Sequence, residues 1–174
     1  PKYSNPTGDT YNAETVQRFA ALGNKAGSNF RIMWDNAYAV HHLKDVHDEL
    51  DNLMARAEQT GNASTVAVFG STSKVTFAGA GISFLGLSDE NLKAFERYLA
   101  TSTLGYDKVN QLRHVQFLKD SAGIAEHMTK HRALIEPKFA TVLDALETEL
   151  SDAGVAEWTK PNGGYFITLN TMPG

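Results

Sequence analysis

The sequence has no cysteine among its 174 residues, which excludes a disulfide framework and a thiolate metal site. It also lacks an apolar run of the length that a membrane-spanning helix needs. Basic residues are scattered, and 16 Lys and Arg against 20 Asp and Glu give a net charge of −4. This balance offers no electrostatic footprint for nucleic acid or an anionic membrane surface. We therefore expect a small-molecule or protein partner and a reducing, cytoplasmic setting.

The composition that remains is that of a globular protein, with 42% hydrophobic and 21% charged residues. Apolar residues recur with helical and strand-like periods in turn along the first hundred residues. This alternation predicts an α/β fold with a parallel or mixed sheet covered by helices, and we expect a mostly parallel sheet with helices on both faces. The expected strands are 30–35, 64–71 and 81–88, and the expected helices are 12–27, 44–61 and 88–102.

The pattern changes after residue 105, where long helical stretches replace the alternation. We expect helices over 105–120 and 123–154, the second kinked near Pro137 because proline lacks the N–H that a helix interior uses. Strand signals return only at Gly164.

We therefore predict two parts in the chain. Residues 1–120 would form part of a large α/β domain, and residues 121–174 a connecting helix and the start of a smaller α+β domain. The chain starts with Pro1 rather than Met, and its strand-like end, 164–174, has no evident partner. Both features lead us to expect a piece of a longer protein.

The stretch "STSKVTFAGAG", residues 71–81, places a lysine directly after a buried strand. Ligands of parallel sheets bind beyond the carboxyl ends of the strands, and Lys74 lies there. Its amine can attack a carbonyl, Ser71 and Ser73 can donate to phosphate oxygens, and Gly79 and Gly81 let backbone approach a bound group. Taken alone, a solvated lysine in a polar loop explains the stretch equally simply.

Three further polar residues follow apolar segments in the same way. Asp35 ends the expected strand 30–35, Tyr38 lies three residues later, and Asn5 heads a "NPTG" turn. Each has an ordinary structural explanation as a turn, a cap or a core residue. In a parallel sheet, however, they converge with Lys74 on one rim.

The series "NPTG", "DNAY" and "STSK" resembles the large domain of fold type I pyridoxal-phosphate aminotransferases of the aspartate aminotransferase class. The resemblance implies pyridoxal 5'-phosphate (PLP) as cofactor, amino acids and 2-oxo acids as substrates, possible use of aspartate or glutamate, and a homodimer. The late segment "PNGGYFI" is similar to the Gly-aromatic strand with which the family's small domain approaches the substrate.

By this resemblance, Lys74 would form the Schiff base with PLP and later move a proton as general base and acid. Asp35 would keep a proton on the pyridine nitrogen. Tyr38 and Asn5 would hydrogen-bond the phenolic oxygen of the cofactor.

The phosphate site departs from the family pattern. The resemblance implies that Ser71 and Ser73 bind the phosphate, but the arginine that usually follows the lysine is missing. Ile82 and Ser83 occupy that vicinity, so we expect Ser83 or nearby backbone N–H groups to share the contact. This departure predicts an atypical subgroup.

Two other functions stay open on the sequence. One is a PLP-binding regulatory domain of an aminotransferase-like transcription factor, and the other is a non-catalytic α/β binding module in which the motif series is a coincidence. Trp34 and Trp158 are predicted to be packing residues rather than stacking platforms.

The histidines do not have the spacing of a standard metal site. We predict no metal at His41, His42 and His47, and we expect the helical pair His127 and His131 to lie on a solvated face.

Overall fold

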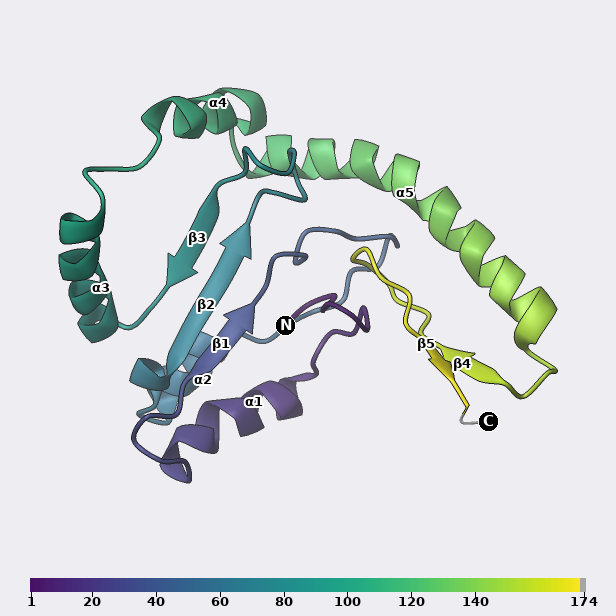
Figure 1. The fold of residues 1–174 in the computed structure, drawn as a ribbon, viewed down its shortest axis with the longest axis horizontal. Helices are drawn as coiled ribbons and strands as arrows, with labels where there is room; N and C mark the ends of the chain where they lie inside the picture. Colours follow the sequence, from purple (N-terminus) through teal and green to yellow (C-terminus); the bar gives the residue numbers. More distant parts are fainter. Residues whose placement is uncertain (173–174) are drawn as a thin grey trace.

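The computed structural model describes residues 1–172. Residues 1–102 hold a three-stranded sheet and the α-helices α1 to α3, and residues 103–172 hold two further α-helices and an antiparallel pair of strands (Figure 1). In chain order the elements are α1 (Ala13–Ala21), β1 (Ile32–Asp35), α2 (Leu53–Gln59), β2 (Val66–Ser71), β3 (Ser83–Gly86), α3 (Asp89–Ser102), α4 (Lys108–Leu118), α5 (Ser121–Leu150), β4 (Ala156–Trp158) and β5 (Leu169–Thr171), with 3-10 turns at Leu22–Asn24 and Ala63–Thr65.

The sheet is mixed rather than mostly parallel. β1 and β2 pair in parallel, from Ile32 opposite Val66 to Asp35 opposite Phe69. β2 and β3 pair antiparallel, so of the parallel and mixed sheets that the sequence allows, the structure has the mixed one. A parallel return needs a crossover of roughly a dozen or more residues, usually helical, whereas residues 72–82 form only a short turn-rich loop.

One face of the sheet is covered by α1 and α2. Trp34 and Val66 on the sheet pack against helix residues such as Val16 and Ala57, and all four are at least 96% buried. On the opposite face, Met33 is 79% exposed. The layer of α1 and α2 thus covers one face of the sheet, while helices on the other face stay a prediction. Trp34 is a core residue, as predicted.

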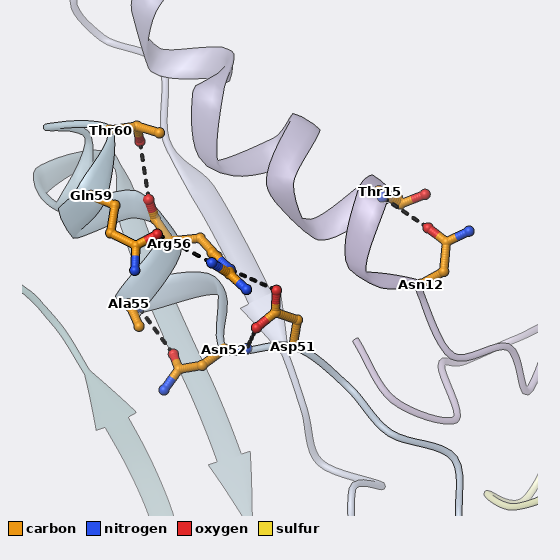
Figure 2. Close-up of polar contacts among 8 residues, drawn as sticks. All are labelled: Asn12, Thr15, Asp51, Asn52, Ala55, Arg56, Gln59 and Thr60. Atoms are coloured by element: carbon orange, nitrogen blue, oxygen red, sulfur yellow. Dashed lines mark hydrogen bonds and ion pairs between the residues drawn. The ribbon is translucent and has the colours of Figure 1, made fainter.

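Asparagine side chains set where the first two helices begin (Figure 2). Asn12 accepts a hydrogen bond from the Thr15 N–H, and Asn52 accepts one from the Ala55 N–H at 3.1 Å. The predicted helix over 44–61 is therefore too long at its start, because α2 begins only after Asn52. N-cap residues have extended backbone, which separates the preceding segment from the helix. The helix over 88–102 starts as predicted, with Ser88 as its N-cap.

A second hydrophobic cluster joins the loop after β2 to the two later helices. Val75 of that loop packs with Leu118 of α4 and Met128 of α5, and all three are buried. Apolar contacts with α4 and α5 thereby fix Val75, the residue after Lys74.

The C-terminal part holds the long helix α5, which runs through Pro137 and curves along its length in Figure 1. The kink expected near Pro137 stays a prediction. β5 is paired antiparallel with β4, Trp158 lying opposite Leu169, so the prediction of a last strand without a partner in this chain is wrong. β4 spans only three residues, too few to show a strand period in the sequence.

The start of α5 at Ser121 coincides with the predicted boundary between residues 1–120 and 121–174. The division into two domains itself stays a prediction. Among residues 1–172, no helix combines the length and the apolar character that crossing a bilayer requires.

Candidate active site

The predicted site residues meet at one rim of the sheet because β1 and β2 run in the same direction. Asp35 is the last residue of β1 and Ser71 the last of β2, and the Asn36 N–H donates to the Phe69 carbonyl at 2.8 Å. Ser83 lies opposite Ser71, since antiparallel β3 begins where β2 ends. Asp35, Ser71 and Ser83 thus share the rim, although Ser83 reaches it from the amino end of its strand.

The two serines of "STSK" are joined to each other. The Ser71 hydroxyl accepts from the Ser73 N–H at 3.1 Å and donates to the Ser73 hydroxyl at 3.0 Å. Gly81 folds back against this turn, since a Cβ there would lie 2.7 Å from both Cα and N of Ser73. The close approach predicted at Gly81 is therefore made to the chain's own Ser73. Gly79 has a φ of +84°, which favours glycine.

Lys74 follows this turn with its side chain exposed. Within residues 1–172, its ammonium group makes no hydrogen bond or ion pair. The Asp35 carboxylate is also exposed and accepts the Ala37 N–H at 3.0 Å. The rim therefore presents an amine, a carboxylate and several hydroxyls outward.

Tyr38 is only 8% exposed and lies among other rings. Its ring meets those of His41, Tyr165 and Phe166 edge-on, at centroid distances of 5.7, 5.8 and 5.5 Å. Burial, with a smaller contribution from the negative charge of Asp35, raises the pKa of Tyr38. Its hydroxyl is consequently protonated at neutral pH and available as a donor.

Asn5 lies in an exposed turn of the N-terminal segment. The backbone N–H of Lys2 donates to the Asn36 side chain at 3.0 Å, which ties the N-terminal segment to the residue after Asp35. The Thr168 hydroxyl donates to the Pro6 carbonyl at 2.7 Å. The Asn5 amide itself makes no hydrogen bond within the described residues, so its role stays a prediction.

Sequence reasoning missed the histidines around the lysine loop. His127 and His131 do not lie on a solvated face, so that prediction is wrong: His127 Nε2 lies 2.6 Å from the Val75 carbonyl, and His131 Nε2 lies 2.8 Å from the Tyr165 hydroxyl. His41 Nε2 lies 3.0 Å from the Lys74 carbonyl. The i, i+4 spacing of His127 and His131 on α5 is visible in the sequence, but their partners, the Val75 carbonyl and the Tyr165 hydroxyl, lie far along the chain.

A buried hydroxyl fixes the other side of the loop. Thr72 is 8% exposed; its Oγ1 accepts the Ile82 N–H at 2.7 Å and lies 3.0 Å from His114 Nε2. The His114 Nδ1 donates to the Asn110 carbonyl at 2.9 Å, so Nε2 carries the lone pair that accepts from Thr72. Because the Ile82 N–H is already bonded to Thr72, it is not available to replace the missing phosphate-binding arginine.

The donor set fits the cofactor that the resemblance implies. A carboxylate suits a protonated pyridine nitrogen, an unpaired amine suits an aldehyde, and clustered serine hydroxyls suit a phosphate. The folded-back turn at Gly81, which a Cβ would fill, keeps the two serines on the rim beside Lys74.

Comparisons with known proteins agree with this arrangement. A protein-family model described as aspartate amino-transferase matches residues 1–174. The chain is 47% identical over 174 residues to an aminotransferase of Mycolicibacterium smegmatis and 44% identical to an aspartate aminotransferase of Corynebacterium glutamicum, covering all of this chain and 40% of each relative. The chain thus spans about 40% of the length of these curated relatives.

Solved structures show the same likeness. An aspartate transaminase of Corynebacterium glutamicum superposes with a TM-score of 0.95 at 44% identity, over 100% of this chain and 41% of the other. An α-aminoadipate aminotransferase of Thermus thermophilus, solved with N-(5'-phosphopyridoxyl)-L-leucine, superposes at 0.76 with 24% identity, over 97% of this chain and 41% of that one. At that identity, the second comparison supports the fold alone.

Proposed function

Because the chain belongs to the aspartate aminotransferase family, we propose that the full-length protein is a PLP-dependent aminotransferase, which moves an amino group from an amino acid to a 2-oxo acid. The observation that carries the proposal is the position of Lys74, exposed and without a partner among residues 1–172, on the rim that also holds Asp35. A shared rim at the ends of parallel strands is the usual ligand position in such sheets.

In this proposal each rim residue holds one part of the cofactor. The Lys74 amine binds its aldehyde carbon, and the Asp35 carboxylate holds a proton on its ring nitrogen. Tyr38 donates to the phenolic oxygen, which its raised pKa favours, and Asn5 donates beside it. The hydroxyls of Ser71, Ser73 and Ser83 bind the phosphate, in place of the family's missing arginine.

When bound, the cofactor supplies an electron sink for the negative charge that develops on the substrate Cα. Asp35 maintains that sink, because a carboxylate stabilises the protonated nitrogen and an amide would not. Lys74, freed when the substrate amine takes its place, would take the proton from Cα as general base and deliver it as general acid to the carbon that was the cofactor's aldehyde carbon. An exposed and unpaired amine is free to make this exchange.

Aspartate or glutamate as substrate, a homodimer and a cytoplasmic location belong to the same proposal. The names of the curated relatives support the enzyme over a PLP-binding regulatory domain of a transcription factor, since both 44–47% identical relatives are aminotransferases by name.

The test uses the full-length protein loaded with PLP. Lys74→Ala should lower transamination of aspartate with 2-oxoglutarate by roughly 10²- to 10⁴-fold or more, because both the covalent link and the proton transfer are lost. Asp35→Asn should lower it by roughly 10²-fold while much of the cofactor stays bound. Lys44→Ala, which removes another exposed lysine in a loop, is the matched control and should keep the wild-type rate.

Borohydride reduction gives a second readout, since it fixes PLP to the lysine that binds it. Peptide mass spectrometry should find the label on Lys74. Label on another lysine, or Lys74→Ala with the same turnover as Lys44→Ala, would refute the assignment. Labelling of Lys74 without turnover of any amino acid would favour the regulatory domain.

A further inference from the structure

Two consecutive backbone carbonyls of the lysine loop accept hydrogen bonds from distant side chains. The Lys74 carbonyl accepts from the Tyr165 hydroxyl at 3.1 Å and from His41 Nε2 at 3.0 Å. The Val75 carbonyl accepts from His127 Nε2 at 2.6 Å. These donors come from the loop after β1, from α5 and from the segment before β5. The backbone at the lysine is thus held from three sides, while the Lys74 side chain stays unbound.

The direction of these hydrogen bonds is fixed by chemistry. A carbonyl can only accept a hydrogen bond, so Tyr165 donates its single hydroxyl hydrogen to the Lys74 carbonyl. His131 Nε2, 2.8 Å from the Tyr165 oxygen, must therefore be the donor to it. Burial, with a smaller effect from His127, lowers the pKa of His131, which favours a neutral ring. The hydrogen bond to Tyr165 then places the proton of this ring on Nε2. The result is a directed chain from His131 through Tyr165 to Lys74.

Apolar and aromatic contacts surround this series of hydrogen bonds at the lysine. Val75, the next residue, is 5% exposed and packs on Leu118 and Met128, so the loop is held by apolar contacts on that side. The rings of His41 and Tyr165 lie 5.0 Å apart, and those of His131 and Tyr165 5.7 Å apart. Loss of one hydroxyl would therefore change the support of one carbonyl without emptying the cluster.

We propose that Tyr165 and His131 are positioning residues for Lys74: Tyr165 holds the lysine's backbone carbonyl, and His131 orients the Tyr165 hydroxyl. The inference rests on the proposed function, since it concerns how the Lys74 amine is presented to an aldehyde. Neither residue touches the reacting atoms in this account. Their effect reaches the amine through the backbone, because a fixed carbonyl restricts the directions that the side chain can take from the Cα.

The experiment measures covalent attachment rather than turnover alone. PLP is added to full-length apoprotein, samples are reduced with borohydride at intervals, and mass spectrometry follows the labelled fraction of Lys74. Tyr165→Phe should slow labelling by about two- to tenfold, the effect of losing one hydrogen bond. Tyr106→Phe is the matched control, because that tyrosine is 58% exposed and its hydroxyl has no hydrogen bond among residues 1–172.

Variants of His131 separate positioning from packing. His131→Leu should slow labelling as much as Tyr165→Phe, whereas His131→Gln keeps an N–H donor and should stay within about twofold of wild type. The double variant Tyr165→Phe/His131→Leu should be no slower than Tyr165→Phe, because His131 acts through Tyr165. In turnover, kcat should fall in these variants with KM nearly unchanged.

The outcomes are distinguishable. If wild-type Lys74 is labelled and Tyr165→Phe is labelled as fast as Tyr106→Phe, the positioning role is refuted while the proposed function stands. Fully additive effects of the two substitutions would refute the chain from His131 to Tyr165. If wild-type Lys74 takes no label, the proposed function fails and this inference fails with it. Melting temperatures of the apoproteins identify any variant that has lost its fold, and His131→Gln then decides the result.

Discussion

The close contact between Gly81 and Ser73 allows a quantitative test of the phosphate-binding turn. Gly81→Ala adds a methyl group whose carbon would lie 2.7 Å from the backbone N and Cα of Ser73. Carbon atoms in contact are normally about 3.5–4.0 Å apart, so the two backbone segments must separate by about 1 Å. The Ser73 hydroxyl is also in the way and could rotate aside, but the overlap with the Ser73 backbone remains after any change of side-chain rotamer.

The cost can be worked from this overlap. Forcing a methyl group into packed space typically costs about 1–3 kcal/mol. In the apoprotein the loop can relax by moving Ser73, at the expense of its 3.0 and 3.1 Å hydrogen bonds with Ser71. If bound phosphate requires the original turn, the strain returns on binding. At about 1.4 kcal/mol per factor of ten, PLP affinity should fall by about 5- to 150-fold.

The assay is a titration of full-length apoprotein with PLP, alongside apoprotein melting. Gly105→Ala is the neutral control, because a Cβ there meets no heavy atom within 4 Å. Gly79→Ala lies in the same loop at φ +84° with open space around it, and it isolates the backbone strain from the clash. The loss of affinity should be largest for Gly81→Ala. Equal affinity of Gly81→Ala and Gly105→Ala would show that the Ser71–Ser73 turn does not bind the phosphate.

Two predictions concern the fold itself. Burial lowers the pKa of His41 and, together with the charges of Lys2 and His47, lowers the pKa of His42 from 6.5 to about 4. The unfolded chain then binds more protons than the folded one between these values, so the free energy of unfolding should fall as the pH drops from about 6.5 to about 4; calorimetry at several pH values measures it, and a melting temperature that rises over this interval would contradict the reasoning. Asn52→Ala removes the acceptor for the Ala55 N–H and should lower the free energy of unfolding by about 1 kcal/mol in denaturant titrations, while unchanged stability would show that the cap contributes nothing.

The rim could be predicted from the sequence because each of its residues follows a local pattern. Asp35 and Ser71 end apolar runs, and the strands that contain them are where the periodicity places them, within a few residues. The direction of β3 could not be predicted in the same way, because strand direction depends on how residues 72–82 fold. The beginning of α2 was missed for a similar reason: the apolar spacing extends upstream of Asn52, but the helix begins only after this N-cap residue.

The contacts that hold the lysine loop carry no such pattern. Tyr165 and Lys74 are 91 residues apart, His127 and Val75 52, and His41 and Lys74 33. Their acceptors are backbone carbonyls, which every residue possesses. The residue types at positions 74 and 75 therefore do not predict that a histidine or tyrosine will bind there. Pairs of side chains with opposite charge or matching polarity can be sought in a sequence. A side chain that binds a backbone carbonyl has no such partner residue type. Such donors become visible only when the fold brings α5 and the segment before β5 against the loop. This explains why the sequence places His127 on a solvated helix face, although it binds the Val75 carbonyl beside the proposed catalytic lysine. His131 binds a side chain, the Tyr165 hydroxyl, but only the fold brings the two residues together.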